Sequence, residues 1–304
     1  MPSHAPAFSG AMHRRDVLLG SLAALVGCAQ SPPRPASAES KPQSELAALE
    51  ARVGGRVGVY AVDTATGRAL AHREDERFAM CSTFKWLLAA AVLARVDRGE
   101  LALADRVPFG RGDLQEHAPT AREHVDEGAM TVDALAEAAV LVSDNTAANL
   151  LLARVGGPAG LTRFVRGTGD EVTRLDRVEP SMNEHAAGDP RDTTSPRAMV
   201  TAMRAVLLGE VLAPASRERL LGWMRACATG KERLRRGFPA TWEAGDKTGT
   251  GPRGAVNDVA IAWPPGRSPI LVAAYLCDGP SDVRTLAAAH AEIGRLVATL
   301  ARGG

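Results

Sequence analysis

The sequence lacks a marked excess of charge of either sign. Its 304 residues include 36 lysines and arginines and 35 aspartates and glutamates, a formal net charge of +1. Binding nucleic acid calls for a concentrated basic face to neutralise phosphates, so we expect no nucleic-acid partner. Hydrophobic residues make up 45% of the chain, enough for the core of one large domain or two medium ones.

Cysteine is also scarce, with four residues in the chain. If Cys28 is modified as described below, Cys81, Cys227 and Cys277 remain, and an odd number cannot pair completely. We therefore expect no disulfide framework. Cys81 lacks the surroundings of a catalytic cysteine and is interpreted as a small buried residue. No histidine has a partner at metal-ligand spacing, so we expect no metal and no cofactor.

Residues 1–43 are interpreted as an export signal and tether rather than as part of the fold. Arg14 and Arg15 precede an apolar run from Val17 to Gly27, which is too short to span a membrane as a helix. The paired arginines fit a twin-arginine signal, with an ordinary secretory signal as the alternative. Either signal predicts a periplasmic protein.

Leu25-Val26-Gly27-Cys28 closes this apolar run and resembles a lipoprotein processing box. Cleavage at Ala36-Ser37-Ala38 is the alternative, but that site lies farther from the apolar run than such sites usually do. We therefore favour a lipidated Cys28 as a membrane tether, with residues 31–41 as a flexible linker.

Four short motifs follow one another along the rest of the chain. They are Ser82-Thr83-Phe84-Lys85, Ser143-Asp144-Asn145, Glu179-Pro180-Ser181-Met182-Asn183 and Lys247-Thr248-Gly249. An isolated S-x-x-K is expected by chance about once in a chain of this length, whereas S-D-N and K-T-G are each expected roughly a few hundredths of a time. Their joint occurrence in this order is the strongest signal in the sequence.

On these motifs the chain resembles the class A serine β-lactamases, from about residue 44 to the C-terminus. The flanking stretches Ser143-Asp144-Asn145-Thr146-Ala147-Ala148-Asn149 and Arg191-Asp192-Thr193-Thr194 extend the similarity. The resemblance implies hydrolysis of a small-molecule β-lactam through a covalent acyl-enzyme. We expect the protein to act as a monomer.

Ser82 and Lys85 are the candidate nucleophile and its basic neighbour. Three residues apart at a helix start, they share one face, and the helix N-terminus favours negative charge on the serine oxygen. The resemblance implies that Ser143 passes a proton to the departing ring nitrogen. It also implies that Asn145 binds the side-chain amide of the substrate, while Asp144 caps the following helix.

Lys247-Thr248-Gly249 is expected to precede a strand, where glycine lets a ligand approach the backbone. The resemblance implies that Lys247 and Thr248 bind the substrate carboxylate. It also implies that the backbone N–H groups of Ser82 and Thr250 form an oxyanion hole, which is usually a large catalytic contribution.

Glu179 distinguishes hydrolysis from acylation alone. In the family this glutamate and the asparagine four residues later, here Asn183, hold the water that attacks the acyl-enzyme. Arg177 and Asp192 match an ion pair that closes the loop. The base for acylation is either Glu179 through water or Lys85, and the sequence does not choose between them.

Two further positions are assigned by resemblance. Many relatives carry an arginine where this chain has Val256, and a subset supplies it from the position of Arg233. We therefore assign Arg233 to the substrate carboxylate, the alternative being a solvated arginine in the charged stretch 231–236. His117 occupies a position at the cleft mouth where relatives have an aromatic residue, and it is expected to contact substrate.

The expected fold is α+β, a two-domain fold like that of serine β-lactamases and penicillin-binding proteins. An antiparallel sheet flanked by helices would combine hairpins from both ends of the chain, with an all-α domain inserted between them. We expect an α/β domain of residues 44–79 plus 228–304 and an all-α domain of residues 80–227, with the site between them. Strands are expected over residues 55–63, from the turn at 64–67 to residue 73, and over 256–263 and 270–277. Helices are expected over residues 45–53, 83–97, 131–141, 146–155, 158–166, 196–208, 214–227 and 282–301.

Two other functions share the nucleophile motifs. A penicillin-binding DD-peptidase would be acylated by β-lactams without releasing them, and a penicilloylated sensor module would be acylated once and coupled to a membrane helix. The segment from Glu179 to Asn183 argues against both.

Overall fold

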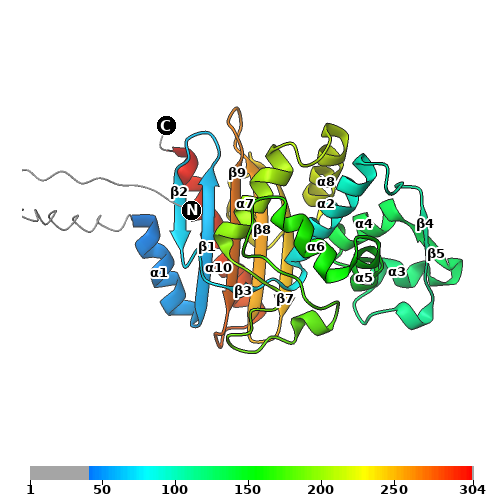
Figure 1. Cartoon of the computed structure of the whole chain (residues 1–304). Helices are drawn as coiled ribbons and strands as arrows, with labels where there is room; N and C mark the ends of the chain where they lie inside the picture. The colour runs from blue at the N-terminus through cyan, green and yellow to red at the C-terminus, as the bar shows by residue number, and fades with distance from the viewer. Residues whose placement is uncertain (1–40, 303–304) are drawn as a thin grey trace, which may run out of the picture. The chain divides into compact units, whose positions relative to one another are not determined.

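A five-stranded antiparallel sheet forms the centre of the protein in a computed structural model, which describes residues 41–302 (Figure 1). The strand order is β2-β1-β9-β8-β7. The sheet therefore joins two hairpins from opposite ends of the described chain, as expected from the sequence. The strands are β1 (Arg56–Asp63), β2 (Ala69–His72), β7 (Glu243–Gly251), β8 (Ala255–Trp263) and β9 (Ile270–Cys277).

Local chemistry fixes the first turn of the sheet. Asp63 Oδ1 accepts hydrogen bonds from the backbone N–H groups of Ala65 and Thr66, and Gly67 adopts a left-handed φ of 73°. Aspartate suits such a turn because its carboxylate accepts hydrogen bonds from the backbone that follows it. Glycine suits the left-handed position because it lacks a Cβ. The register then pairs Val62 with Ala69.

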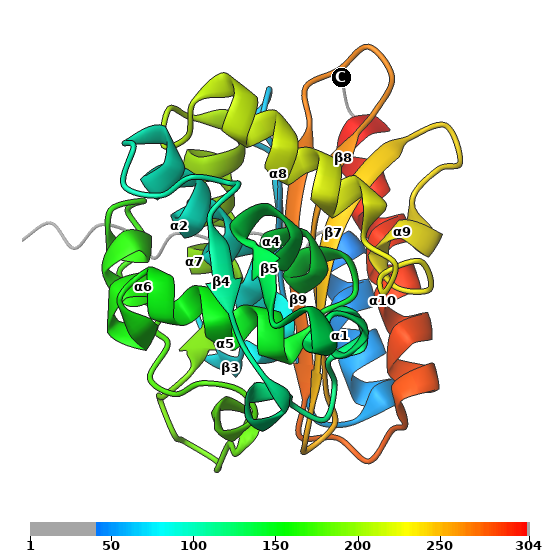
Figure 2. The same cartoon turned by 90° about the vertical axis from the view of Figure 1, so that its right-hand side faces the viewer.

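Two helices cover one face of the sheet. They are α1 (Lys41–Val53) and α10 (Val283–Ala298), whose apolar side chains pack with those of β1, β8 and β9. Asp282 begins α10 by accepting a hydrogen bond of 2.7 Å from the backbone N–H of Thr285. Figure 2 shows both helices next to each other on the same side of the sheet.

Most of the remaining helices lie on the opposite side of the sheet, with α2 (Phe84–Asp97) at their centre (Figure 2). Helix α2 contacts α4, α5, α6 and α8, and its residues from Phe84 to Ala94 are buried. Most of its faces are therefore apolar, as expected for a helix surrounded by protein. The others on this side are α3 (Pro119–Glu123), α4 (Val132–Leu141), α5 (Asn145–Arg154), α6 (Gly157–Arg166), α7 (Pro196–Met203) and α8 (Pro214–Ala226). The short helix α9 (Leu234–Gly237) instead packs against α10, on the face that α1 and α10 cover.

Several expected helix starts are confirmed. Ser195 caps α7 by accepting from the backbone N–H of Ala198, and Pro196 takes the first helical position. Thr131 caps α4 and Asp144 caps α5 in the same way.

The expected position of the fourth motif was wrong, because Lys247, Thr248 and Gly249 lie within β7 rather than before a strand. Three glycines and an aspartate give this segment low intrinsic strand propensity. Pairing with β8 along all nine residues overrides that preference. Four short strands also went unpredicted, namely β3 (Phe78–Ala79), β4 (Arg106–Pro108), β5 (Ala129–Thr131) and β6 (Thr193–Thr194).

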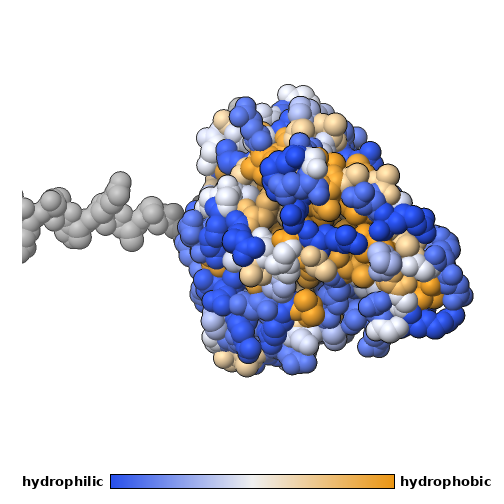
Figure 3. All heavy atoms as spheres, turned by 45° about the vertical axis from the view of Figure 1, so that its right-hand side comes forward, coloured by the Kyte–Doolittle hydropathy of each residue, from blue (hydrophilic) through white to orange (hydrophobic). Residues whose placement is uncertain are grey.

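Hydrophobic residues gather toward the middle of the face shown in Figure 3, with hydrophilic residues around them. Among the described residues, the exposed large hydrophobic side chains are Val178, Leu208 and Val283, which lie on separate segments. Scattered residues of this kind do not mark a docking surface. Within residues 41–302, no helix is long and apolar enough to cross a membrane. The boundaries of the two expected domains and the monomeric state stay predictions.

Candidate active site

The site is built around the turn that leads into α2. Ser82 lies in the 3-10 turn Cys81–Thr83, directly before Phe84 begins the helix. Lys85, in the first turn of α2, is completely buried. The Ser82 hydroxyl lies 3.4 Å from Glu179 Oε1, and that same oxygen lies 3.1 Å from Lys85 Nζ. The carboxylate therefore contacts both the candidate nucleophile and the lysine beside it.

Lys85 is held by four oxygens in addition to its burial. Nζ donates to Ser143 O at 2.8 Å, to Ser143 Oγ at 3.3 Å and to Asn145 Oδ1 at 2.5 Å, besides its contact with Glu179. Burial lowers the pKa of the Lys85 ammonium, and the Glu179 carboxylate opposes that shift. An amine with a lowered pKa is better able to accept a proton at neutral pH.

The Ser143-Asp144-Asn145 loop faces this lysine because Asp144 anchors it. Asp144 Oδ1 caps α5, and Oδ2 accepts from the backbone N–H groups of Thr120 and Ala121. Ser143 has a left-handed φ of 62°, unusual for a residue with a Cβ. Its hydroxyl lies 3.3 Å from Lys85 Nζ and 3.1 Å from Lys247 Nζ, between two cations.

Glu179 is fixed by two asparagine side chains. Asn183 Nδ2 donates to Oε2 at 2.7 Å, so the two carboxylate oxygens have different partners. Asn149 clamps the backbone of Glu179, donating to its carbonyl at 2.8 Å and accepting from its N–H at 3.0 Å. Asn149 lies in the stretch that extends the family resemblance, and its role becomes visible only in the structure.

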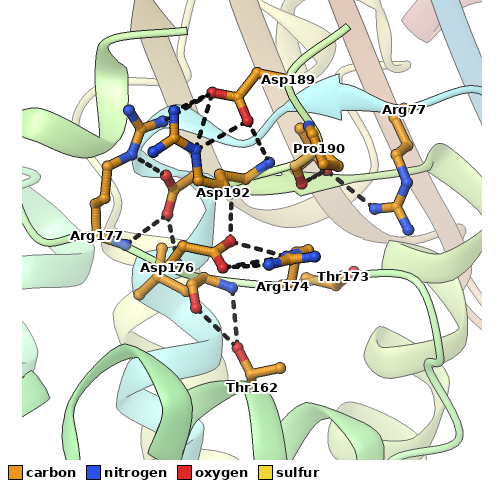
Figure 4. A network of polar contacts seen from close by, with 12 residues as sticks. Arg77, Thr162, Thr173, Arg174, Asp176, Arg177, Asp189, Pro190 and Asp192 are labelled. Carbon is orange, nitrogen blue, oxygen red and sulfur yellow. Dashed lines mark hydrogen bonds and ion pairs between the residues drawn. The ribbon is translucent and has the colours of Figure 1, made fainter.

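Acidic and basic side chains tie together the two ends of the loop that carries Glu179 (Figure 4). Arg177 Nε donates to Asp192 Oδ2 at 2.6 Å, which confirms the expected ion pair. Asp192 Oδ1 also accepts from the backbone N–H groups of Asp176 and Arg177. Hydrogen bonds from Arg174 lower the pKa of Asp176. The loop is therefore closed by charge-assisted hydrogen bonds, which are stronger than neutral ones.

Lys247 lies in the sheet, and its side chain reaches Ser143. Its side chain is completely buried, and burial lowers the pKa of the ammonium to about 8. Nζ donates to Thr248 O at 2.8 Å and to the Ser143 hydroxyl. The Thr248 hydroxyl lies 2.6 Å from that of Thr229, which sequence reasoning had not singled out.

The glycines of β7 permit a close approach to the nucleophile's turn, while the expected approach of a ligand stays a prediction. A Cβ on Gly249 would lie 2.7 Å from Met80 O and 3.2 Å from Ser82 N, closer than packed atoms normally approach. A Cβ on Gly251 would lie 2.7 Å from Cys81 Sγ. These glycines let the strand pack against the backbone of the nucleophile's own turn.

Arg233 is buried, so its interpretation as a solvated arginine is wrong. Its guanidinium donates to Thr250 Oγ1 at 2.7 Å, to Gly249 O at 2.8 Å and to Asn257 O at 2.6 Å. The arginine thus contacts the side chain of Thr250 directly. Val256, where many relatives carry the arginine, is completely buried and apolar.

His117 is exposed beside the Ser143 loop. Its Nε2 lies 3.0 Å from Val142 O, and its own carbonyl accepts from the backbone N–H of Asn145 at 2.9 Å. The structure therefore places His117 next to Asn145, a residue of the site. Its contact with substrate stays a prediction.

The cysteines of the described chain, Cys81, Cys227 and Cys277, are all free. Cys81 is buried as expected, and burial raises the pKa of its thiol to about 12. A thiol with so high a pKa is a poor nucleophile at neutral pH. Within residues 41–302, no cluster of three histidine, cysteine, aspartate or glutamate side chains could hold a metal ion.

Comparisons with known proteins agree with this geometry. A family model described as "Beta-lactamase enzyme family" matches residues 41–300. Beta-lactamase L2 from Stenotrophomonas maltophilia is 46% identical over 291 residues, which cover 95% of each chain. The carbapenem-hydrolyzing beta-lactamase KPC from Klebsiella oxytoca is 46% identical over 231 residues, covering 76% of this chain and 78% of that protein.

Among solved structures, an ancestral (GNCA) class A beta-lactamase matches with a TM-score of 0.83 and 57% identity. The match covers 85% of this chain and 99% of that one. The α+β fold is thus the one expected from the sequence, that of the serine β-lactamases and penicillin-binding proteins. The chain belongs to the beta-lactamase enzyme family, and within it to the class A serine β-lactamases.

Proposed function

We propose that the protein hydrolyses β-lactam antibiotics through a covalent acyl-enzyme on Ser82. The observation that carries this proposal is the position of Glu179, whose Oε1 contacts both the Ser82 hydroxyl and Lys85 Nζ. Ser82 Oγ attacks the lactam carbonyl, and the Ser82 proton passes to Lys85 or, through water, to Glu179. Ser143, held between Lys85 and Lys247, returns a proton to the departing nitrogen.

Release of the product distinguishes this function from that of a DD-peptidase. Glu179 Oε2 is held by Asn183, while Oε1 remains directed at the reacting serine. A carboxylate oriented in this way can take a proton from water as that water attacks the acyl carbonyl. Neither a DD-peptidase nor a penicilloylated sensor module would require the pair of Glu179 and Asn183.

The test is hydrolysis of one penicillin, one cephalosporin, one monobactam and one carbapenem by the purified protein, with intact-mass spectra recorded during turnover. Multiple turnovers of at least one class, with a transient mass increase equal to the substrate, are expected. A single permanent acylation without turnover would favour the DD-peptidase or sensor instead.

The substrate carboxylate is proposed to bind Lys247, Thr248 and the Thr250 hydroxyl, with Arg233 acting from behind Thr250. Loss of Arg233 removes a charge-assisted hydrogen bond from that hydroxyl. We expect Arg233→Ala to lower kcat/KM for a penicillin by roughly tenfold or more, with a raised KM.

The matched control for this variant is the methyl ester of the same penicillin, which lacks the charge. The loss caused by Arg233→Ala should be much smaller for the ester than for the acid. Equal losses for acid and ester would show that Arg233 supports the strand through Gly249 and Asn257 rather than the carboxylate.

Class A β-lactamases are typically exported. We propose that residues 1–43 direct export to the periplasm through a twin-arginine signal and that Cys28 is lipidated; this segment lies outside the described residues, apart from 41–43. Cys28→Ser in the full chain is expected to move the protein from the membrane to the soluble fraction and to abolish metabolic lipid labelling. Wild-type protein without label in the soluble fraction would contradict the anchor.

A further inference from the structure

Asn257 joins the sheet to the backbone that immediately precedes the nucleophile. Its side chain is buried in β8, and Nδ2 donates to Ala79 O at 2.9 Å and to Met80 O at 3.3 Å. These two carbonyls come directly before Cys81 and Ser82. Asn257 lies outside the four motifs of the sequence.

The turn that Asn257 holds has an unfavourable backbone conformation. Cys81 has a left-handed φ of 45°, although it carries a Cβ. Such a conformation persists only where the surroundings hold it, and it is common at functional sites. The direction of the Ser82 N–H depends on this conformation, because Cys81 supplies the carbonyl half of the peptide that carries it.

The same turn also rests on β7. Asn257 is paired with Gly249 across the sheet, and Gly249 packs against Met80 O and Ser82 N. Arg233 donates to the carbonyls of both Gly249 and Asn257. The side chain of Asn257 therefore holds the nucleophile's turn, while its backbone in β8 pairs with β7, which carries Thr250, and accepts a hydrogen bond from Arg233.

We propose that Asn257 is a positioning residue that sets the Ser82 N–H relative to the Thr250 N–H, the two donors assigned to the oxyanion hole. This inference rests on the proposed hydrolysis of β-lactams. Two donors stabilise a developing oxyanion only if both point at one place, and a displacement of about 1 Å can cost on the order of a hundredfold in rate.

Asn257→Ala tests the proposal through the chemistry of each correctly folded molecule. The acylation rate constant for a penicillin, referred to active sites counted by titration, is expected to fall roughly 10- to 100-fold. Affinity for phenylboronic acid, whose tetrahedral serine adduct places an oxygen in the oxyanion hole, should fall by a similar factor. A residue that only stabilises the fold would change neither quantity per active site.

Ser216→Ala is the matched control, because Ser216 is also a buried side chain and the change removes its partly buried hydrogen bond from Oγ to Asp97 Oδ1. Asp97 ends the 14-residue α2, so this pair lies about 20 Å from the nucleophile's turn. The control should lower the melting temperature without changing acylation per active site. Asn257→Ser, which keeps a shorter donor, should fall between wild type and Asn257→Ala and serves if the alanine variant does not fold.

Wild-type rates of acylation and boronate affinity in the folded Asn257 variants would overturn the positioning role while leaving the proposed function intact. Failure of the proposed function has a different signature, since the wild-type protein itself would then not turn over any β-lactam.

Discussion

Replacing Ser82 with alanine is expected to abolish both hydrolysis and acyl-adduct formation. Ser82 Oγ is the one atom proposed to form a covalent bond with substrate, so no other group substitutes for it. Intact-mass spectra recorded with excess penicillin should show the unmodified mass of Ser82→Ala throughout, whereas wild type shows the transient adduct. Turnover should fall to the limit of detection.

Cys81→Ala is the matched comparison, since Cys81 is the neighbouring residue with a potentially nucleophilic side chain. The Cys81 thiol is buried and its pKa is raised, so it is a poor nucleophile. Alanine removes the sulfur and is smaller than cysteine, so it fits the same buried position. This variant should keep substantial activity. An adduct that persists on Ser82→Ala but disappears from Cys81→Ala would show that the sulfur, and not the hydroxyl, is acylated.

Much of the fold follows from local sequence signals. Apolar runs bounded by turn residues placed β1, β8 and β9 within about a residue of their observed ends, and Ser195-Pro196 placed the start of α7. These elements were predictable because burial pattern, capping and turn chemistry agree. β7 was missed as a strand because its glycines oppose strand formation and only pairing with β8 fixes it.

The candidate site divides in a similar way between motif residues and residues that only the fold brings together. Ser82, Lys85, Ser143 and Lys247 lie in recognisable motifs, and the structure places them around shared contacts. Asn257 carries no motif of its own. Its proposed role rests on contacts with Ala79 and Met80, 178 and 177 residues earlier in the chain, which no local pattern in one sequence reveals.

Replacing Glu179 with glutamine is expected to lower turnover of a penicillin by roughly 10²- to 10⁴-fold, the contribution usual for a general base. Glutamine keeps the size of the side chain but cannot take a proton from the attacking water. Removing the carboxylate also removes the group that opposes the lowered pKa of Lys85, so the buried amine is left more readily neutral. Lys85 then remains able to accept the Ser82 proton, and the acyl-enzyme should accumulate to nearly one per protein and persist.

Glu184→Gln provides the control, because Glu184 is an exposed carboxylate in the same loop. It should turn over penicillin at close to the wild-type rate. Turnover by Glu179→Gln within tenfold of wild type would contradict the assignment of Glu179 as the base for deacylation. The rate at which the adduct first forms then distinguishes the two candidate acylation bases: a rate near wild type assigns that step to Lys85, whereas a loss as large as that in turnover assigns it to Glu179 acting through water.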